Sequence, residues 1–141
     1  MAWLIEETDS EDLALELEAS LLNELSRRRP QGVNSTIELV CHKDGVLKGG
    51  LLGTTSYGWF LLKILWVAPP FRRQGLARAL FDRACTLAKA RDCHSVWLDT
   101  SDPKARQVYL RWGFVQFGHL ENGPDKTPPE HCRWFLQRLI I

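Results

Sequence analysis

The sequence predicts one α/β (α+β) domain over residues 1–141, with a mixed, mostly antiparallel twisted sheet and one parallel strand pair. An Asp44-Gly45 turn between two strand-like runs is typical of an antiparallel hairpin. Further on, an apolar run at 61–67, a helical pattern over 75–92 and an apolar run at 95–99 form a strand–helix–strand unit, whose strands are parallel. A chain of 141 residues is long enough to bury one core.

The first thirty residues predict a short strand and a helix. Residues 3–5 are apolar and are expected to form the strand. Ser10 fits a helix cap, and the acidic residues after it favour the helix dipole. Pro30 and Gly32 end the helix. Leucines every four residues give the helix an apolar stripe: Leu13, Leu17, Leu21 and Leu25.

A meander of three strands follows, over residues 36–42, 46–55 and 59–67. Its second strand contains three glycines, which indicate a bulge or a close approach of another backbone or a ligand: Gly49, Gly50 and Gly53.

After the strand–helix–strand unit, Asp102 fits the cap of another helix, with Pro103 at its first position and Gly113 at its end. The remaining predicted elements are a strand at 114–118, a loop at 121–130 and a final apolar strand at 133–139. That last strand would allow pairing with a second subunit, so we expect a homodimer as one available state.

The net charge of +1 favours neither a nucleic-acid partner nor a membrane surface. The charge is uneven, however, because residues 1–24 hold eight acids and no lysine or arginine, which leaves nine acids against eighteen bases in the remainder. The pattern fits an acidic helix on a basic body, or a body that holds a polyanionic ligand.

The chain is expected to be cytoplasmic, since it has no apolar run of about 20 residues and no secretory signal pattern. The four cysteines form no C-x-x-C, so reduced thiols are expected. Three of them adjoin a histidine, but neighbours on a strand point to opposite faces, so we expect no metal site.

A basic loop connects the strand at 61–67 to the helix that follows it: Arg72-Arg73-Gln74-Gly75-Leu76-Ala77. The first amides of a helix have no internal partners and bind anions, Gly75 permits close approach, and the arginines suit phosphate. Neither G-x-x-x-x-G-K-[ST] nor G-x-G-x-x-G is present, which argues against a P-loop or a dinucleotide fold. The loop therefore predicts a site for a different phosphorylated cofactor.

The segment from Val67 to Ala77 resembles the R/Q-x-x-G-x-G/A signature of the GNAT superfamily of N-acetyltransferases. The family's downstream pattern A-x-x-x-Y-x-x-x-G-F is matched by Ala105, Tyr109, Gly113 and Phe114. The chain resembles a small single-domain subgroup of that superfamily. It departs from the family pattern at Asp102, where asparagine is usual, and in the run 101–104.

This resemblance implies acetyl-CoA as co-substrate, and a GNAT fold whose central parallel pair splays around it, with helices on both faces of the sheet. The pyrophosphate would bind the amides of Arg72, Arg73, Gln74, Gly75, Leu76 and Ala77. The strand at Leu65, Trp66 and Val67 would hold the pantetheine arm and the thioester carbonyl, with Asp102 and Ala105 as further contacts.

Tyr109 occupies the family's general-acid position. The base that takes the proton of the acceptor amine is open between Asp99, His119, Glu121 and ordered water, with Asp99 at the strand end as our choice. The predicted function is direct transfer of an acetyl group to a small-molecule or peptide amine in a ternary complex. The alternatives are a non-catalytic acyl-CoA-binding or protein-interaction module, and a basic nucleic-acid binder.

Overall fold

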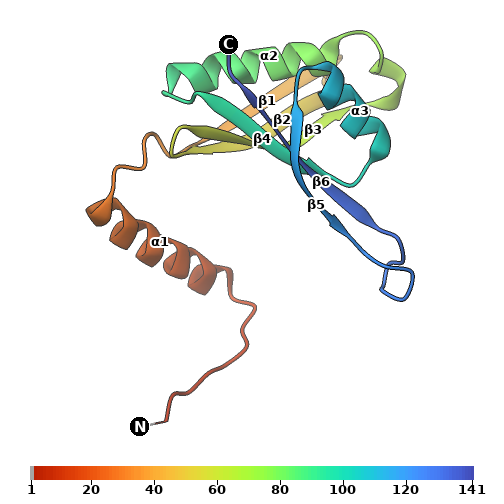
Figure 1. The fold of residues 1–141 in the computed structure, drawn as a ribbon. Helices are drawn as coiled ribbons and strands as arrows, with labels where there is room; N and C mark the ends of the chain where they lie inside the picture. The colour runs from red at the N-terminus through yellow and green to blue at the C-terminus, as the bar shows by residue number, and fades with distance from the viewer. Residues whose placement is uncertain (1) are drawn as a thin grey trace. The chain divides into compact units, whose positions relative to one another are not determined.

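The computed structural model describes residues 2–141, and Figure 1 shows their fold. The elements in chain order are α1 (Glu11–Arg28), β1 (Ser35–Lys43), β2 (Val46–Ser56), β3 (Trp59–Val67), the short 3₁₀ helix η1 (Pro69–Phe71), α2 (Leu76–Ala90), β4 (Ser95–Thr100), α3 (Pro103–Arg111), β5 (Val115–Glu121) and β6 (Cys132–Leu139).

The chain divides into two compact units, and the boundary in the sequence lies between Gln31 and Gly32. In the first unit, the Ser10 hydroxyl caps α1 by accepting a hydrogen bond from the Leu13 amide at 3.3 Å, as predicted. The strand expected at residues 3–5 is wrong, because residues 2–10 carry no regular secondary structure. A strand needs a neighbouring main chain, and α1 is the one regular element among residues 2–31.

The second unit is built on a six-stranded sheet in the order β1-β2-β3-β4-β6-β5. Every neighbouring pair is antiparallel except β3 and β4, which are parallel and connected through α2. This confirms the predicted fold class. The expectation of helices on both faces of the sheet stays a prediction, because α1 belongs to the other unit and the two units are described separately.

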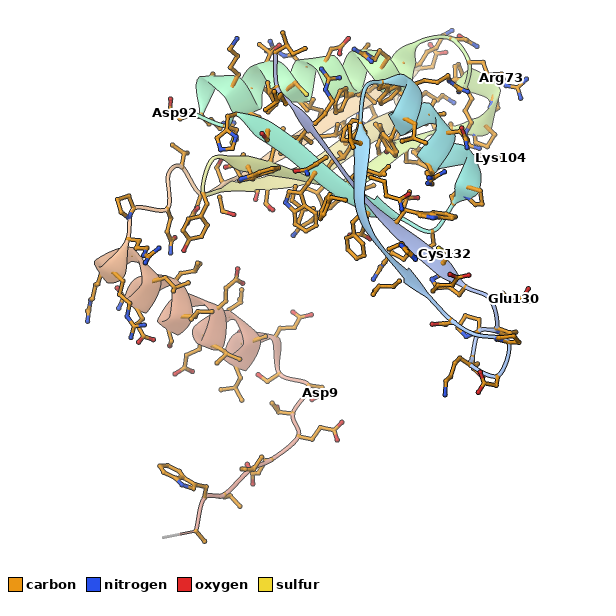
Figure 2. The ribbon with its side chains drawn as sticks, in the orientation of Figure 1. Asp9, Arg73, Asp92, Lys104, Glu130 and Cys132 are labelled. Carbon is orange, nitrogen blue, oxygen red and sulfur yellow. The ribbon has the colours of Figure 1, made fainter. Side chains whose placement is uncertain are left out.

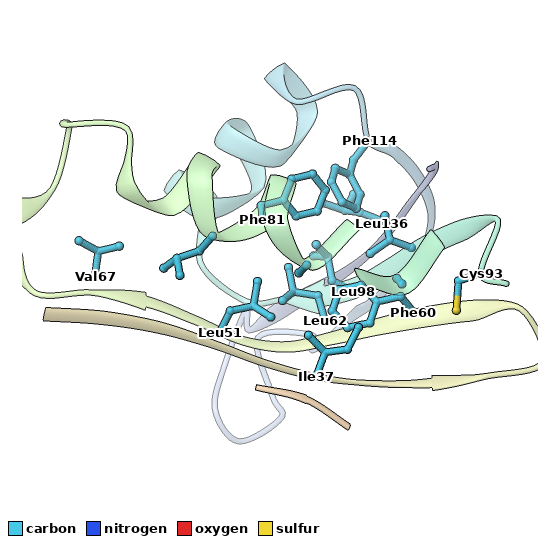
Figure 3. Packing of buried hydrophobic residues seen from close by; sticks show 14 residues of the cluster. Ile37, Leu51, Phe60, Leu62, Val67, Phe81, Cys93, Leu98, Phe114 and Leu136 are labelled. Atoms are coloured by element: carbon cyan, nitrogen blue, oxygen red, sulfur yellow. The ribbon is translucent and has the colours of Figure 1, made fainter. Parts of the chain in front are cut away.

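One hydrophobic core joins α2 and α3 to the sheet, and Figure 3 shows its packing. Both helices pack against this same core, so they lie on one side of the sheet (Figure 1). We call it the helix face and the other side the reverse face. The fully buried side chains with the largest volumes are Phe60, Phe81, Ile37, Leu98, Leu136 and Val96.

The position of β6 contradicts the expectation that the final strand pairs with a second subunit. β6 hydrogen-bonds to β4 on one side and to β5 on the other, so neither of its edges is available. The edge strands of the sheet are β1 and β5.

No helix among residues 2–141 combines the length and the apolar character needed to cross a membrane.

Candidate active site

The basic loop lies between the end of β3 and the start of α2, as the sequence predicts. Its shape is fixed by two hydrogen bonds near Val67: the Ala68 amide donates to the Lys48 carbonyl at 2.7 Å, and the Arg72 Nε donates to the Val67 carbonyl at 2.8 Å. Arg73 and Gly75 both have positive φ, at 62° and 85°. The sharp turn they make brings the loop directly to the first amides of α2.

The N-terminus of α2 is suited to an anion. Gly75 is its cap residue and makes no side-chain capping bond, so no side chain competes for the first amides of the helix. A cavity of about 730 Å³ opens over this terminus and is bounded on its far side by α3. Figure 2 shows two of its cations, Arg73 and Lys104, at the same end of the second unit.

Five cationic side chains and no carboxylate line this cavity, which we call the cationic cavity. Its lining residues are Val67, Phe71, Arg72, Arg73, Gly75, Leu76, Ala77, Arg78, Lys104, Gln107, Val108, Arg111 and Trp112. Such an environment stabilises phosphate groups, so the residues present fit the polyphosphate end of acetyl-CoA.

The sheet forks next to this cavity. β3 and β4 pair only over Trp59–Leu61 and Ser95–Trp97, although β3 continues to Val67 and β4 to Thr100. On the other side of β3, the register with β2 shifts at Gly53, which leaves Lys63 as an extra residue. This confirms the bulge that the glycines of the second strand indicate. Main-chain groups of β3 that point toward the fork therefore have no partner on β4.

A second cavity of about 300 Å³, which we call the tyrosine cavity, lies where β3, the loop and α3 come together. Its lining residues are Leu65, Trp66, Val67, Arg72, Ala77, Asp102, Ala105, Val108, Tyr109 and Trp112. Five of them also line the cationic cavity, so the two cavities adjoin and together make a path from the loop to Tyr109: Val67, Arg72, Ala77, Val108 and Trp112.

The path brings together nearly all of the predicted cofactor residues. Leu65, Trp66, Val67, Arg72, Ala77, Asp102 and Ala105 line the tyrosine cavity, while Arg73, Gly75 and Leu76 line the cationic cavity. Gln74 lines neither, and its side-chain amide donates to the Pro70 carbonyl at 3.3 Å.

Tyr109 reaches the tyrosine cavity from the second turn of α3. Its ring packs edge-on against Trp112 and Phe114, with centroid distances of 5.5 Å and 5.4 Å. Burial of the phenol raises the pKa of Tyr109 to about 12, because desolvation disfavours the phenolate. Tyr109 is therefore a neutral hydrogen-bond donor throughout the neutral pH range.

Asp102 caps α3, as predicted. Its carboxylate accepts a hydrogen bond from the Lys104 amide at 2.9 Å, and its own amide donates to the Thr100 hydroxyl at 3.2 Å. The side chain that lines the tyrosine cavity is thus also the one that starts the helix carrying Tyr109.

Asp99 lies outside the linings of both cavities. Val96 and Leu98 of β4 point into the core, so strand alternation places Asp99 on the reverse face. There its carboxylate forms an ion pair with Arg133, whose Nε lies 3.1 Å from the Asp99 Oδ1. The other candidate bases, His119 and Glu121, are exposed residues of β5.

Sequence reasoning missed the cations that α3 contributes. Lys104, Val108 and Arg111 all line the cationic cavity and are spaced by four and three residues, which places them on one face of the helix. That spacing is readable in the sequence. It says that the three side chains share a face, but it does not say that this face meets the loop after β3.

Comparisons with known proteins agree with this geometry. The model of the acetyltransferase (GNAT) family matches residues 3–114. An acetyltransferase of Agrobacterium fabrum is 38% identical over 77 residues, which are 55% of this chain and 56% of that protein. A blasticidin-S acetyltransferase of Streptomyces morookaense is 33% identical over 103 residues and 71% of each chain. The chain thus spans little more than half the length of the first of these relatives.

Solved structures share the fold. The crystal structure of an acetyltransferase from Agrobacterium tumefaciens matches with a TM-score of 0.84 and 25% identity, over 99% of both chains. A streptothricin acetyltransferase from Bacillus anthracis, crystallised with acetyl coenzyme A, matches with a TM-score of 0.66 and 16% identity over 80% of this chain and 65% of that one. With the family model matching most of its length, the chain belongs to the GNAT family of acetyltransferases.

Proposed function

We propose that this chain transfers an acetyl group from acetyl-CoA to a primary amine by direct attack in a ternary complex. The supporting observation is that the two cavities adjoin through five common residues, with five cations lining one cavity and Tyr109 lining the other. The family match covers parts of both compact units, which supports residues 1–141 acting as one domain.

Each predicted site residue has a proposed role along this path. The amides at 72–77 and the neighbouring cations hold the phosphates, while Asp102 and Ala105 border the pantetheine arm. Main-chain donors of β3 near Leu65, Trp66 and Val67 stabilise the negative charge that develops on the thioester oxygen. Tyr109 donates a hydrogen bond to the departing sulfur.

Asp99 is proposed to act on the acceptor's side of the sheet. Because Arg133 already binds one of its oxygens, the other oxygen is the one left to accept a hydrogen bond from the acceptor amine. The acceptor is proposed to be a small-molecule or peptide amine, and the relative that is named for blasticidin S supports the small-molecule class.

Calorimetry with CoA and thiol release from acetyl-CoA test the function. The amine panel contains blasticidin S, an aminoglycoside, a polyamine and a dipeptide with a free N-terminus. Binding of CoA together with thiol release on at least one amine is expected. Binding without turnover on any amine would instead favour an acyl-CoA-binding module, and absence of binding would rule out both.

Tyr109→Phe is expected to lower kcat by about 10²-fold, the low end of the range for acid catalysis, with unchanged affinity for acetyl-CoA. The matched control is Tyr57→Phe, since Tyr57 is the chain's other tyrosine and lies exposed in the turn after β2. Full activity of Tyr109→Phe in steady-state thiol release would contradict the proposed role.

A further inference from the structure

A row of polar side chains lies where β4 ends and β6 begins. β4 and β6 are antiparallel, with Asp99 opposite Phe135 and Thr100 opposite Trp134. The Arg106 guanidinium of α3 lies over the Trp134 ring, 5.3 Å from its centroid, so Thr100 and Trp134 belong to the helix face. Strand alternation then places Asp99 and Arg133 on the reverse face, while Ser101 directly follows β4 and His131 directly precedes β6.

Two contacts organise this row. Arg133 binds Asp99 at 3.1 Å, and the Ser101 Oγ and the His131 Nε2 are hydrogen-bonded at 3.2 Å. The backbone at His131 is fixed by the Asn122 amide, which donates to its carbonyl at 2.8 Å. The Ser101–His131 pair is therefore held by the end of β4 on one side and by the β5–β6 hairpin on the other.

The pair adjoins the proposed active site. Ser101 directly precedes Asp102, which lines the tyrosine cavity. β4 has also left β3 by this point, because their pairing ends at Leu61 and Trp97. Ser101 therefore lies just beyond the end of β4, next to a residue that borders the tyrosine cavity. In the proposed reaction, an amine that enters past the end of β4 would meet Ser101 before the thioester.

The proposed reaction requires a group that takes a proton from the acceptor amine. An alkylamine with a pKa near that of lysine is protonated at neutral pH, and only its neutral form attacks a carbonyl carbon. Both Ser101 and His131 have exposed side chains, so a proton that arrives on His131 can pass directly to bulk water.

We propose that Ser101 and His131 form the proton exit of the acceptor amine, an inference that rests on the proposed acetyl transfer. The Ser101 oxygen takes a proton from the amine as the Ser101 hydroxyl proton passes to the His131 Nε2, and the imidazolium then releases a proton to water. The neutral amine attacks the carbonyl carbon, the C–S bond breaks as the thiolate leaves, and the extra proton on the amide nitrogen departs to water through the same Ser101–His131 pair. His131 takes part in the tautomer that carries its proton on Nδ1, which leaves Nε2 free to accept.

The other candidate bases are placed less well for this role. Asp99 is bound to Arg133. His119 lies opposite Trp134 in the register of β5 and β6, which puts it on the helix face. The charged groups around His131 are the Asp99–Arg133 pair, Asp102 after Ser101, Glu130 next to it in the chain, and the Asp125–Lys126 pair in the hairpin loop.

The first test compares His131→Ala with His119→Ala in steady-state thiol release, using the amine from the panel that the wild type acetylates fastest. His131→Ala is expected to lower kcat by about 10²-fold with unchanged acetyl-CoA affinity, and free imidazole in the buffer is expected to restore much of the rate. Ser101→Ala should lose less, because a water molecule can bridge the gap. His119→Ala should keep wild-type kcat.

A rate of His131→Ala equal to that of wild type, or a lost rate that imidazole does not restore, would overturn the proton exit. Unchanged thermal unfolding and unchanged CoA binding in calorimetry exclude misfolding as the cause of a loss. If the wild type binds CoA but acetylates none of the amines, the proposed function has failed.

The second test needs no acceptor. Nitrogen chemical shifts of labelled histidine report the tautomer of His131 at alkaline pH. The wild type is expected to carry the proton on Nδ1, and Ser101→Ala is expected to redistribute it between the two nitrogens. Equal tautomer populations in both proteins would show that the Ser101–His131 bond is absent in solution, and the proposal would fall.

Discussion

Tyr109 shows how one partly buried side chain limits the mechanism. With its pKa at about 12 and that of a departing thiol near 8.5, complete transfer of the phenol proton to the thiolate is uphill by about 5 kcal/mol. A hydrogen bond from the neutral phenol to the sulfur avoids this cost. The aromatic rings of Trp112 and Phe114 thus favour a donor that keeps its proton during the reaction.

The raised pKa of Tyr109 has a measurable effect on stability at high pH. Because the phenol ionises near pH 10 in the unfolded chain and near 12 in the folded one, its contribution to stability is complete below about pH 10 and is lost as the pH rises toward 12. Tyr109 should therefore still be protonated at pH 10, so wild type and Tyr109→Phe should show the same phenolate absorbance at that pH. Ionisation of Tyr109 at pH 10 would contradict the described burial.

At the scale of single elements, the loop before α2 depends on its glycine. Gly75 has a φ of 85° and open space where a Cβ would point. The same is true of Gly113, with a φ of 92°, which lies after α3 and outside both cavities. The two positions therefore make a matched pair that separates backbone strain from ligand contact.

Gly75→Ala and Gly113→Ala should each destabilise the fold by about 1 kcal/mol, since both force alanine into the left-handed region. Only Gly75→Ala should also weaken acetyl-CoA binding, because its Cβ projects where the diphosphate is proposed to lie. Urea unfolding and calorimetry measure the two effects. Equal acetyl-CoA affinities in the two variants would argue against the loop as the phosphate site.

The bulge beside the fork depends on a different glycine. A Cβ added at Gly53 would overlap the Phe60 ring and the Leu61 carbonyl oxygen, and neither can move without disturbing β3. Gly53→Ala should cost at least about 1–3 kcal/mol in urea unfolding. Gly118→Ala is the control within a strand, because the nearest atom to its Cβ is 4.0 Å away, and its loss should be clearly smaller.

Local patterns in the sequence predict the elements whose cause is local. The loop at 72–77, the cap at Asp102 and the bulge near Gly53 each follow from residue types at fixed spacing, and the structure has them. The strand expected at 3–5 and the free edge expected for the final strand are wrong because both depend on distant partners. Likewise, the sequence shows Ser101 and His131 thirty residues apart, and only the register of β4 with β6 brings them together.

At the scale of the whole molecule, the structure shows where part of the excess positive charge lies. The excess of bases outside residues 1–24 is partly concentrated around one cavity, where five cations face no carboxylate. Electrostatic attraction of a phosphorylated ligand to this cavity is therefore expected to depend on ionic strength.

Raising the salt concentration from about 0.05 M to 0.5 M should weaken acetyl-CoA binding by about tenfold, because the shorter Debye length screens the exposed cations. Acetyl-pantetheine, which lacks the phosphates, should bind weakly with little dependence on salt. Calorimetry at both salt concentrations measures the difference. The same salt dependence for both ligands would place the phosphates away from the five cations.

The short pairing of β3 with β4 makes the second unit two three-stranded sheets held edge to edge. One consists of β1, β2 and β3, the other of β4, β6 and β5, and three residue pairs join them. Main-chain hydrogen bonds thus join the two halves only over this short ladder, and the side chains of the common core supply the rest of their attachment. If acetyl-CoA binds in the fork, as we propose, it would contact both halves and add to that attachment.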